Sequence, residues 1–299
     1  MGESTLAVVF AFLAALGFAS GNILVRIGTQ RVSAPTATFF TVLTGAILVV
    51  GLAFAFNLPD IMALPPVAYG WFALMGAMAY LVARVLNNTA ITMIGASRAV
   101  PMASLQPAFA FGLGVAFLGE RPGLLVSLGM PLIVCGLVLV FLAESGSNSK
   151  ERILTAKTLG YLLAIGAAAS FASRDVISRH VVSSIAPPLV TAGFALAIGG
   201  GMLLAVVHRD MAHSLRHLPG RYIIICGLAG ICQGLAVASL FQALSRAPVT
   251  VVSPINASSP LITLALAHLF LRRLESINLL LVMGTLLSVG GVVMVVLGA

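Results

Sequence analysis

The chain has 299 residues, of which 60% are hydrophobic and only 8% are charged, and its formal net charge is +8. A soluble domain carries about a quarter charged residues, so this composition excludes a water-soluble globular protein and favours one that resides in a lipid bilayer. The Lys and Arg residues are scattered between apolar runs rather than clustered, which argues against a nucleic-acid partner.

Ten apolar runs follow one another, each near the length of about 20 residues that a helix needs to cross the hydrocarbon. They cover approximately residues 5–26, 36–57, 66–88, 98–118, 122–143, 158–181, 187–207, 221–244, 250–271 and 276–298. The longest polar connection runs from Glu144 to Lys157. We therefore expect an all-α membrane protein with ten transmembrane helices: a first five-helix repeat over residues 1–145, a linker over 146–157 and a second five-helix repeat over 158–299.

The two halves repeat each other when the sequence is shifted by 153 residues. Because each unit has an odd number of passes, the two units enter the membrane from opposite sides, and an axis in the membrane plane relates them. Such an inverted repeat is typical of secondary transporters, whose substrate site lies near the midplane. The matching pairs include Phe18 with Phe171, Arg26 with Arg179, Pro107 with Pro260 and, after a two-residue insertion, Glu120 with Glu275 and Gly136 with Gly291.

Prolines and polar residues interrupt the fourth and ninth runs at matching places. A proline within a helix frees a carbonyl group, which a bilayer tolerates only where protein or water satisfies it. An amide side chain that faced lipid would likewise be left unpaired. We expect these residues to face the interior, either as kinks that merely fit the bundle or as kinks that shape a cavity. They are Pro101, Ser104, Gln106 and Pro107, and then Pro254, Asn256, Ser259 and Pro260.

The third run carries a second polar cluster. Tyr80, Arg84 and either Asn87 or Asn88 fall on one helical face by their spacing, and Gln233 matches Tyr80 in the second half. An arginine within a span is a functional candidate by default. Arg84 could also extend to the interface, since it lies about one turn from the end of its run. We hypothesise that Arg84 binds a substrate carboxylate in a cavity that Tyr80 lines.

The first and sixth runs match as well, and they place Asn22 opposite Asp175 in the repeat. Asp175 and Arg179 are four residues apart, which allows an ion pair near the interface. The alternative is that Asn22 and Asp175 face the substrate. Apart from Asp175, the acidic residues lie in or near loops, and the first run contains none. Because proton-coupled carriers usually need a carboxylate within the membrane, we expect facilitated export rather than strict proton antiport through a first-helix acid.

The two proline-containing stretches, Ser97–Pro122 and Thr250–Glu275, resemble the drug/metabolite transporter superfamily, and the paired five-helix units resemble its EamA-type domains. The sequence FLGE at Phe117–Glu120 is similar to the end of the fourth helix of that domain, whereas the second copy departs from it and reads FLRRLE. The resemblance covers nearly the whole chain. It implies a cavity lined by helices one, three, four, six, eight and nine, and a relationship to YddG-like amino-acid exporters.

We therefore expect a secondary transporter that exports small polar metabolites, with amino acids as the first hypothesis, and that uses no ATP, since no GxxxxGK loop is present. Sugars, nucleosides or drugs are the alternative substrates, and a membrane-embedded enzyme or a channel are the alternative classes. We expect no catalytic residue, metal or cofactor. The expected partners are the small-molecule substrate and the lipid bilayer.

We expect a multi-pass monomer in a bacterial inner membrane. Loop charge places both termini outside, whereas the resemblance implies cytoplasmic termini, and both orientations stay open.

Overall fold

The computed structural model describes residues 2–30, 32, 34–94, 99, 102, 104–144, 154–214, 220–270 and 279–299, and these residues form helices and connecting turns without a strand. In chain order the helices are α1 (Glu3–Gly28), α2 (Ala34–Phe56), α3 (Leu58–Met62), α4 (Pro66–Gly76), η1 (Ala77–Ala83), α5 (Arg84–Ile94), α7 (Gln106–Leu118), α8 (Leu124–Glu144), α9 (Leu154–Ser184), α10 (Pro188–Ser214), α11 (Gly220–Arg246), α12 (Val249–Asn256), α13 (Ser259–Phe270) and α14 (Leu279–Leu297).

Within the described residues, five segments are long and apolar enough to cross a membrane. They are Glu3–Gly28, Thr36–Phe56, Pro66–Ile91, Pro188–Val206 and Gly220–Arg246, and the shorter apolar helices are Gln106–Leu118, Leu124–Val140 and Val282–Leu297. α9 is 31 residues long but carries charged residues in its second half. With α4, η1 and α5 counted as one pass and α12 and α13 as another, the protein is the predicted all-α membrane protein of ten passes in two inverted five-helix repeats.

Two pairs of glycines show how the repeats are related. Gly129 and Gly136 in α8 match Gly284 and Gly291 in α14 by the repeat. A Cβ placed on Gly129 would lie 2.6 Å from the carbonyl oxygen of Gly291, and one placed on Gly136 would lie 2.5 Å from that of Gly284. α8 and α14 are therefore antiparallel. Gly129 contacts Gly291, the counterpart of Gly136, and Gly136 contacts Gly284, the counterpart of Gly129. A two-fold axis produces this pattern.

The second helix of each repeat confirms the inversion. Gly193 of α10 lies against Val50 of α2, and Gly200 lies against Val42, so residue numbers rise along one helix as they fall along the other. Equivalent helices that run in opposite directions within one bundle require the two repeats to be inverted, as the odd number of passes predicts.

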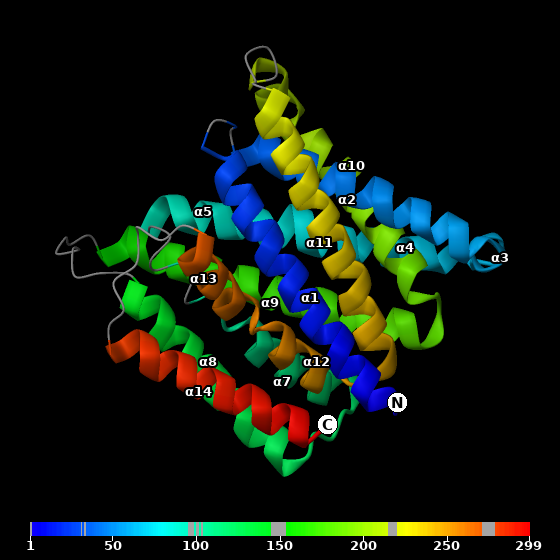
Figure 1. Cartoon of the computed structure of the whole chain (residues 1–299). Coiled ribbons are helices and arrows are strands. Elements are labelled where there is room, and N and C mark those ends of the chain that lie inside the picture. The colour runs from blue at the N-terminus through cyan, green and yellow to red at the C-terminus, as the bar shows by residue number, and fades with distance from the viewer. Residues whose placement is uncertain are drawn as a thin grey trace.

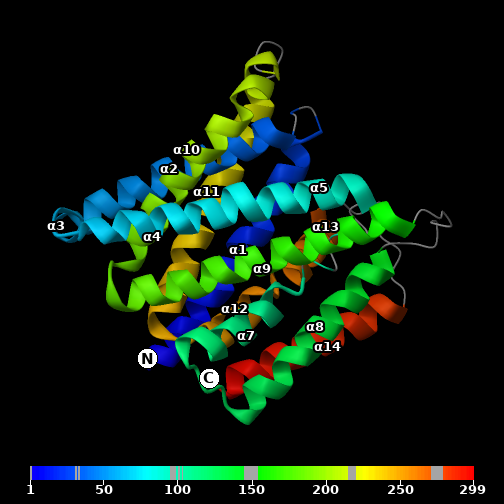
Figure 2. The same ribbon diagram turned by 180° about the vertical axis from the view of Figure 1, so that it is seen from behind.

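The repeats are interleaved rather than set side by side. The most extensive contacts between helices join α1 to α11, α8 to α14, α2 to α10, α2 to α11 and α5 to α9, and in each pair the two helices belong to different repeats. α8 and α14 lie alongside each other in both views, and the two termini are close together (Figures 1 and 2). Termini at the same end of the molecule are expected for an even number of passes.

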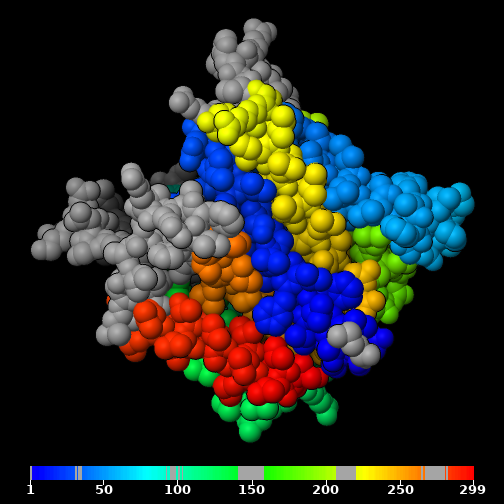
Figure 3. Space-filling model, in the orientation of Figure 1, coloured from blue at the N-terminus to red at the C-terminus, as the bar shows by residue number. Residues whose placement is uncertain are grey.

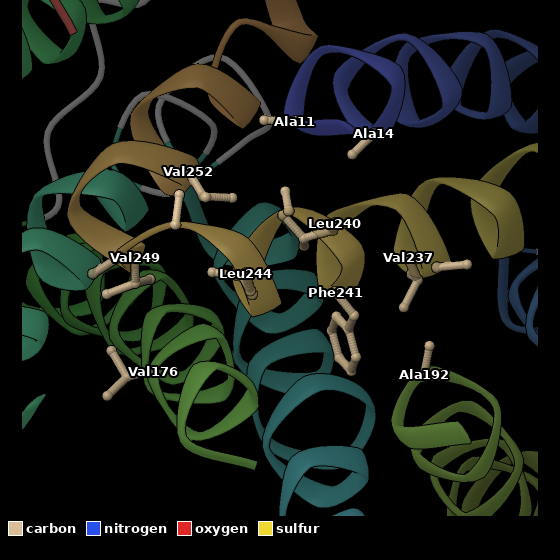
Figure 4. Packing of buried hydrophobic residues seen from close by; sticks show 14 of the residues in the cluster. Ala11, Ala14, Val176, Ala192, Val237, Leu240, Phe241, Leu244, Val249 and Val252 are labelled. Carbon is tan, nitrogen blue, oxygen red and sulfur yellow. The ribbon is translucent and has the colours of Figure 1, made fainter. Parts of the chain in front are cut away.

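Small residues, mainly alanine, fill much of the interior, and a few large apolar side chains pack among them. α11 presents Leu240, Phe241 and Leu244 to the core, where they are almost fully buried, with Val176 of α9 and Ala192 of α10 nearby (Figure 4). Small side chains allow the backbones of membrane helices to approach closely.

The outer surface is apolar as well. On one face α1 lies between α11 and α13, with α14 beside them (Figure 3). Ile47, Phe117 and Leu286 are among the large apolar side chains that are exposed. An apolar outer surface of this kind suits lipid as the surrounding solvent.

Two predicted spans are not continuous α-helices. The ninth consists of α12 and α13 with a turn between them, and the third contains η1, a seven-residue π-helix. Sequence periodicity gave no indication of the π-helix. Segments of π-helix are rare and occur frequently at functional sites.

Candidate functional site

The ninth pass is interrupted in the interior of the molecule. α12 ends at Asn256, residues 257–258 form a turn, and α13 begins at Ser259. Pro260 has no N–H group and cannot continue the hydrogen-bond pattern of α12 across the turn, but it is tolerated in the first turn of a new helix. Instead of the expected kink, the ninth pass is interrupted before Pro260, and a new helix begins at Ser259.

The fourth pass repeats this arrangement. Ser104 and Leu105 form a turn, and α7 begins at Gln106 with Pro107 as its second residue. The first N–H groups of a helix have no partner within the helix, and its N-terminus carries the positive end of the helix dipole. Both repeats therefore present a helix N-terminus at equivalent places in the interior, around Pro107 and Pro260.

A cavity of about 350 Å³ lies where these helix ends meet, between the two repeats. Its volume falls within the range of small-molecule binding sites. Every helix that the resemblance implied contributes to the wall, and α2, α8 and α10 contribute as well. The lining residues are Phe18, Asn22, Thr41, Val42, Gly45, Ala79, Tyr80, Arg84, Ser104, Gln106, Pro107, Leu137, Phe171, Arg174, Leu196, Gln233, Gly234, Val237, Ser253, Asn256, Ala257, Ser259 and Pro260.

Arg84 forms one charged point of this wall. It follows directly on η1, and its guanidinium lies 5.8 Å from the centre of the Tyr80 ring, a cation–π contact. Its Nη1 donates a hydrogen bond to the Thr38 hydroxyl over 3.3 Å. Among the described residues, no carboxylate lies within 4.0 Å of the Arg84 guanidinium. The positive charge is thus held in place by neutral groups and stays available to an anion.

Arg174, Asp175 and Gln106 form a second polar cluster at the wall. Arg174 Nη2 lies 2.7 Å from Asp175 Oδ1, and Gln106 Nε2 donates to Asp175 Oδ2 over 2.9 Å. Asp175 itself is 1% exposed and does not line the cavity. Its carboxylate therefore ties the start of α7 to α9 and fixes the guanidinium of Arg174, which does line the cavity.

The expected ion pair between Asp175 and Arg179 does not form, because Asp175 is directed to Arg174 and Gln106 instead. Asp175 is also buried in the bundle rather than placed at an interface. Arg179 Nη1 donates to the backbone carbonyl of Leu244 at the end of α11. Residues four apart on a helix are within reach of each other, but the neighbouring helices decide which partner each one takes.

The opposite part of the wall is neutral. Gln233 Nε2 of α11 donates to Asn22 Oδ1 of α1 over 3.3 Å. Asn256, at the break of the ninth pass, has a buried Oδ1 that accepts no hydrogen bond within the described part of the chain. The amides supply donors and acceptors without adding charge.

A protein-family model matches the chain twice, over residues 5–142 and over residues 158–297, and it is the model of the EamA-like transporter family. The chain belongs to the EamA-like transporter family. It is therefore a membrane transporter of the drug/metabolite superfamily. A solved structure described only as "Crystal structure of protein" is similar to this EamA-like transporter over 96% of this chain and 95% of the other, with a TM-score of 0.80 and 19% sequence identity. That likeness concerns the fold alone. No curated protein matches the chain.

The cavity of this EamA-like transporter brings together most of the residues that the sequence singled out. They are Asn22, Tyr80, Arg84, Ser104, Gln106, Pro107, Gln233, Asn256, Ser259 and Pro260. Asn87, Asp175 and Pro254 do not line it. Pro254 lies inside α12, where it is buried. Pro101 lies outside the described residues, and the role of each of these residues in transport stays a prediction.

Sequence reasoning missed several lining residues of the transporter. Phe18 and Phe171 are equivalent in the two repeats, and that match was a usable signal. Arg174 has a neutral repeat counterpart, Gly21, but its place within a predicted span was itself a usable signal. Within the described residues, no group of three or more His, Cys, Asp or Glu side chains is arranged to hold a metal ion.

Proposed function

We propose that this EamA-like transporter exports small polar metabolites, with amino acids as the substrate class, as a secondary carrier. The observation that carries the proposal is the cavity of about 350 Å³ between inverted repeats, lined by two guanidiniums, several amides and hydroxyls, and two helix starts. Substrate sites at interrupted helices between inverted repeats are a general feature of secondary transporters.

The chemistry of the cavity matches a compact molecule with a carboxylate. Arg84 offers a guanidinium with no carboxylate partner among the described residues, and the start of α13 near Ser259 offers backbone N–H groups. Amides and hydroxyls, including Asn22 and Ser253, are suited to the polar remainder of the substrate. Sugars would need the same hydroxyl and amide partners but no cation, so Arg84 favours an acid over a sugar.

We also propose an alternating-access mechanism. The cavity lies between inverted repeats, and an interrupted helix from each repeat ends at it, which is the arrangement through which secondary carriers expose one site to either side of the membrane in turn. We further propose that the protein acts as a monomer in a bacterial inner membrane and performs no catalysis.

The test is transport by the purified full-length chain in liposomes. Liposomes loaded with unlabelled amino acids are diluted into labelled amino acids, sugars or nucleosides, and the exchange of label is followed. We expect labelled amino acids to accumulate in protein-containing liposomes and not in empty ones. Accumulation of only sugars or nucleosides would replace amino acids as the substrate class, and no accumulation of any compound would overturn the proposal.

A pair of arginine variants tests the carboxylate role. Arg84→Ala removes the cation of the cavity wall, and we expect amino-acid exchange to fall by about tenfold or more, since a charged hydrogen bond is worth about 1.5–3 kcal/mol. Arg121→Ala is the matched control, because Arg121 is exposed in the loop between α7 and α8. Equal exchange by wild type and Arg84→Ala would remove Arg84 from the binding site.

A further inference from the structure

The charges of the cavity break the two-fold symmetry of the fold. The repeat places Arg84 opposite Val237 and Arg174 opposite Gly21. Val237 lines the same cavity as the two arginines, so equivalent positions of the two repeats meet in one space. In each of these two pairs, the arginine is charged and its counterpart in the other repeat is neutral.

All of this charge lies on one side. Arg84 follows η1, Arg174 is on α9, and these helices pack against each other. The equivalent pair of helices, α1 and α11, presents Asn22 and Gln233, which hydrogen bond to each other. The symmetric scaffold therefore encloses a cationic wall and a neutral amide wall.

The cationic wall is only partly neutralised. Asp175 lies 2.7 Å from Arg174 and offsets its charge. Its repeat counterpart is Asn22, an amide of nearly the same shape, so the neutral wall has no carboxylate at the equivalent place. Among the described residues, the two guanidiniums that line the cavity and the Asp175 carboxylate behind Arg174 leave one positive charge in excess.

We infer that the cavity selects substrates that carry one more negative than positive charge, such as amino acids with an acidic side chain or simple carboxylates, over zwitterions of the same size. A substrate with a net charge of minus one neutralises the site, whereas a zwitterion leaves one guanidinium of the site without a balancing negative charge. The Arg84 side chain is half-buried and that of Arg174 is 11% exposed, so an excess positive charge there is incompletely solvated and costly to leave unpaired. Specificity is the difference in binding free energy between the two classes of substrate. The inference rests on the proposed function, since it names the substrate class of the same cavity.

The experiment compares labelled L-glutamate with labelled L-glutamine, which differ by one charge at equal chain length, in liposomes that contain the purified chain. We expect glutamate exchange to exceed glutamine exchange by about tenfold or more at low concentration. Aspartate and asparagine form a second pair with the same expected order. Equal or faster exchange of glutamine overturns this inference and leaves the proposed function standing. No exchange of any amino acid overturns the proposed function and this inference with it.

Substitution of Asn22 tests the electrostatic cause. Asn22→Asp adds a carboxylate to the neutral wall, and its oxygen can keep the hydrogen bond from Gln233. We expect the preference for glutamate to collapse to about one or to reverse, with faster glutamine exchange. Gln30→Glu adds the same charge beyond the end of α1, where the side chain is exposed, and should keep the preference.

An unchanged ratio in Asn22→Asp overturns the inference, provided that the variant elutes as a single species in gel filtration. Arg84→Gln gives an independent readout, because it removes the excess positive charge instead of compensating for it. We expect it to lower glutamate exchange more than glutamine exchange. Equal losses for the two substrates would assign Arg84 a role without charge selectivity and overturn the inference.

Discussion

The Glu120 carboxylate at the end of α7 accepts a hydrogen bond from the backbone N–H of Val249, the first residue of α12, over 2.8 Å. Its second oxygen accepts from the N–H of Thr250 over 2.9 Å. A residue of the first repeat thus caps a helix of the second, where the N–H groups would otherwise be unpaired. An acid that the sequence placed in a loop joins the two repeats.

We predict that Glu120→Ala destabilises the protein by about 1–2 kcal/mol, because two charge-assisted bonds to a helix N-terminus are lost. In detergent the apparent melting temperature should fall by about 2–6 °C. Glu3→Ala is the control, since the Glu3 side chain is 77% exposed and its pairing with Arg246 at 3.6 Å is a surface contact. Equal shifts in the two variants would contradict the capping role.

The crossing of α8 and α14 predicts a difference between two glycines. A Cβ at Gly136 would lie 2.5 Å from the carbonyl oxygen of Gly284, so Gly136→Ala forces the helices apart and should cost about 1–3 kcal/mol. A Cβ at Gly112 in α7 meets nothing within 4 Å. Gly112→Ala should therefore be neutral or stabilising by up to about 1 kcal/mol, since alanine is the better helix former. Thermal unfolding of both variants measures the contrast, and similar destabilisation by both would count against the close crossing.

The bond between Gln106 and Asp175 predicts a coupled pair. Gln106→Leu leaves one oxygen of a buried carboxylate without its donor, which should cost about 1–3 kcal/mol and lower transport several-fold. The loss should shrink by about 0.5–3 kcal/mol in an Asp175→Asn background, because the group that needs the donor is no longer charged. Thermal unfolding of the wild type, the two single variants and the double variant measures this coupling. If the losses of stability in the two single variants add up to that of the double variant, the two residues act separately.

The helix breaks predict that two prolines matter for transport more than for stability. In Pro107→Ala and Pro260→Ala the added N–H group lets the helix extend across the turn, which fills the break and restricts movement. We expect exchange to fall several-fold while the melting temperature stays the same or rises. Pro131→Ala is the control, because Pro131 is exposed within α8 and does not line the cavity. A comparable loss in the control would show that any proline substitution slows the carrier.

Periodicity predicted the third pass, and two of the three polar residues that it grouped line the cavity. Tyr80, Arg84 and Asn87 share a face on a regular α-helix, yet only the first two reach the cavity. Tyr80 lies in η1, where each turn of the π-helix contains more residues and changes the angles between side chains. Such a local widening depends on the packing of the segment against α9 and α10, so a short sequence window does not reveal it.

The sequence by itself determined the ten passes, the duplication, the inversion and many of the polar residues of the cavity wall. Apolar length, an odd number of passes and prolines in matching register are properties of the chain alone. Only the tertiary structure decided the partner of Asp175, the place of Arg174 and the bond from Glu120 to the second repeat. The physical reason is that each of these depends on groups far apart along the chain, such as Glu120 and Val249, which helix packing brings together.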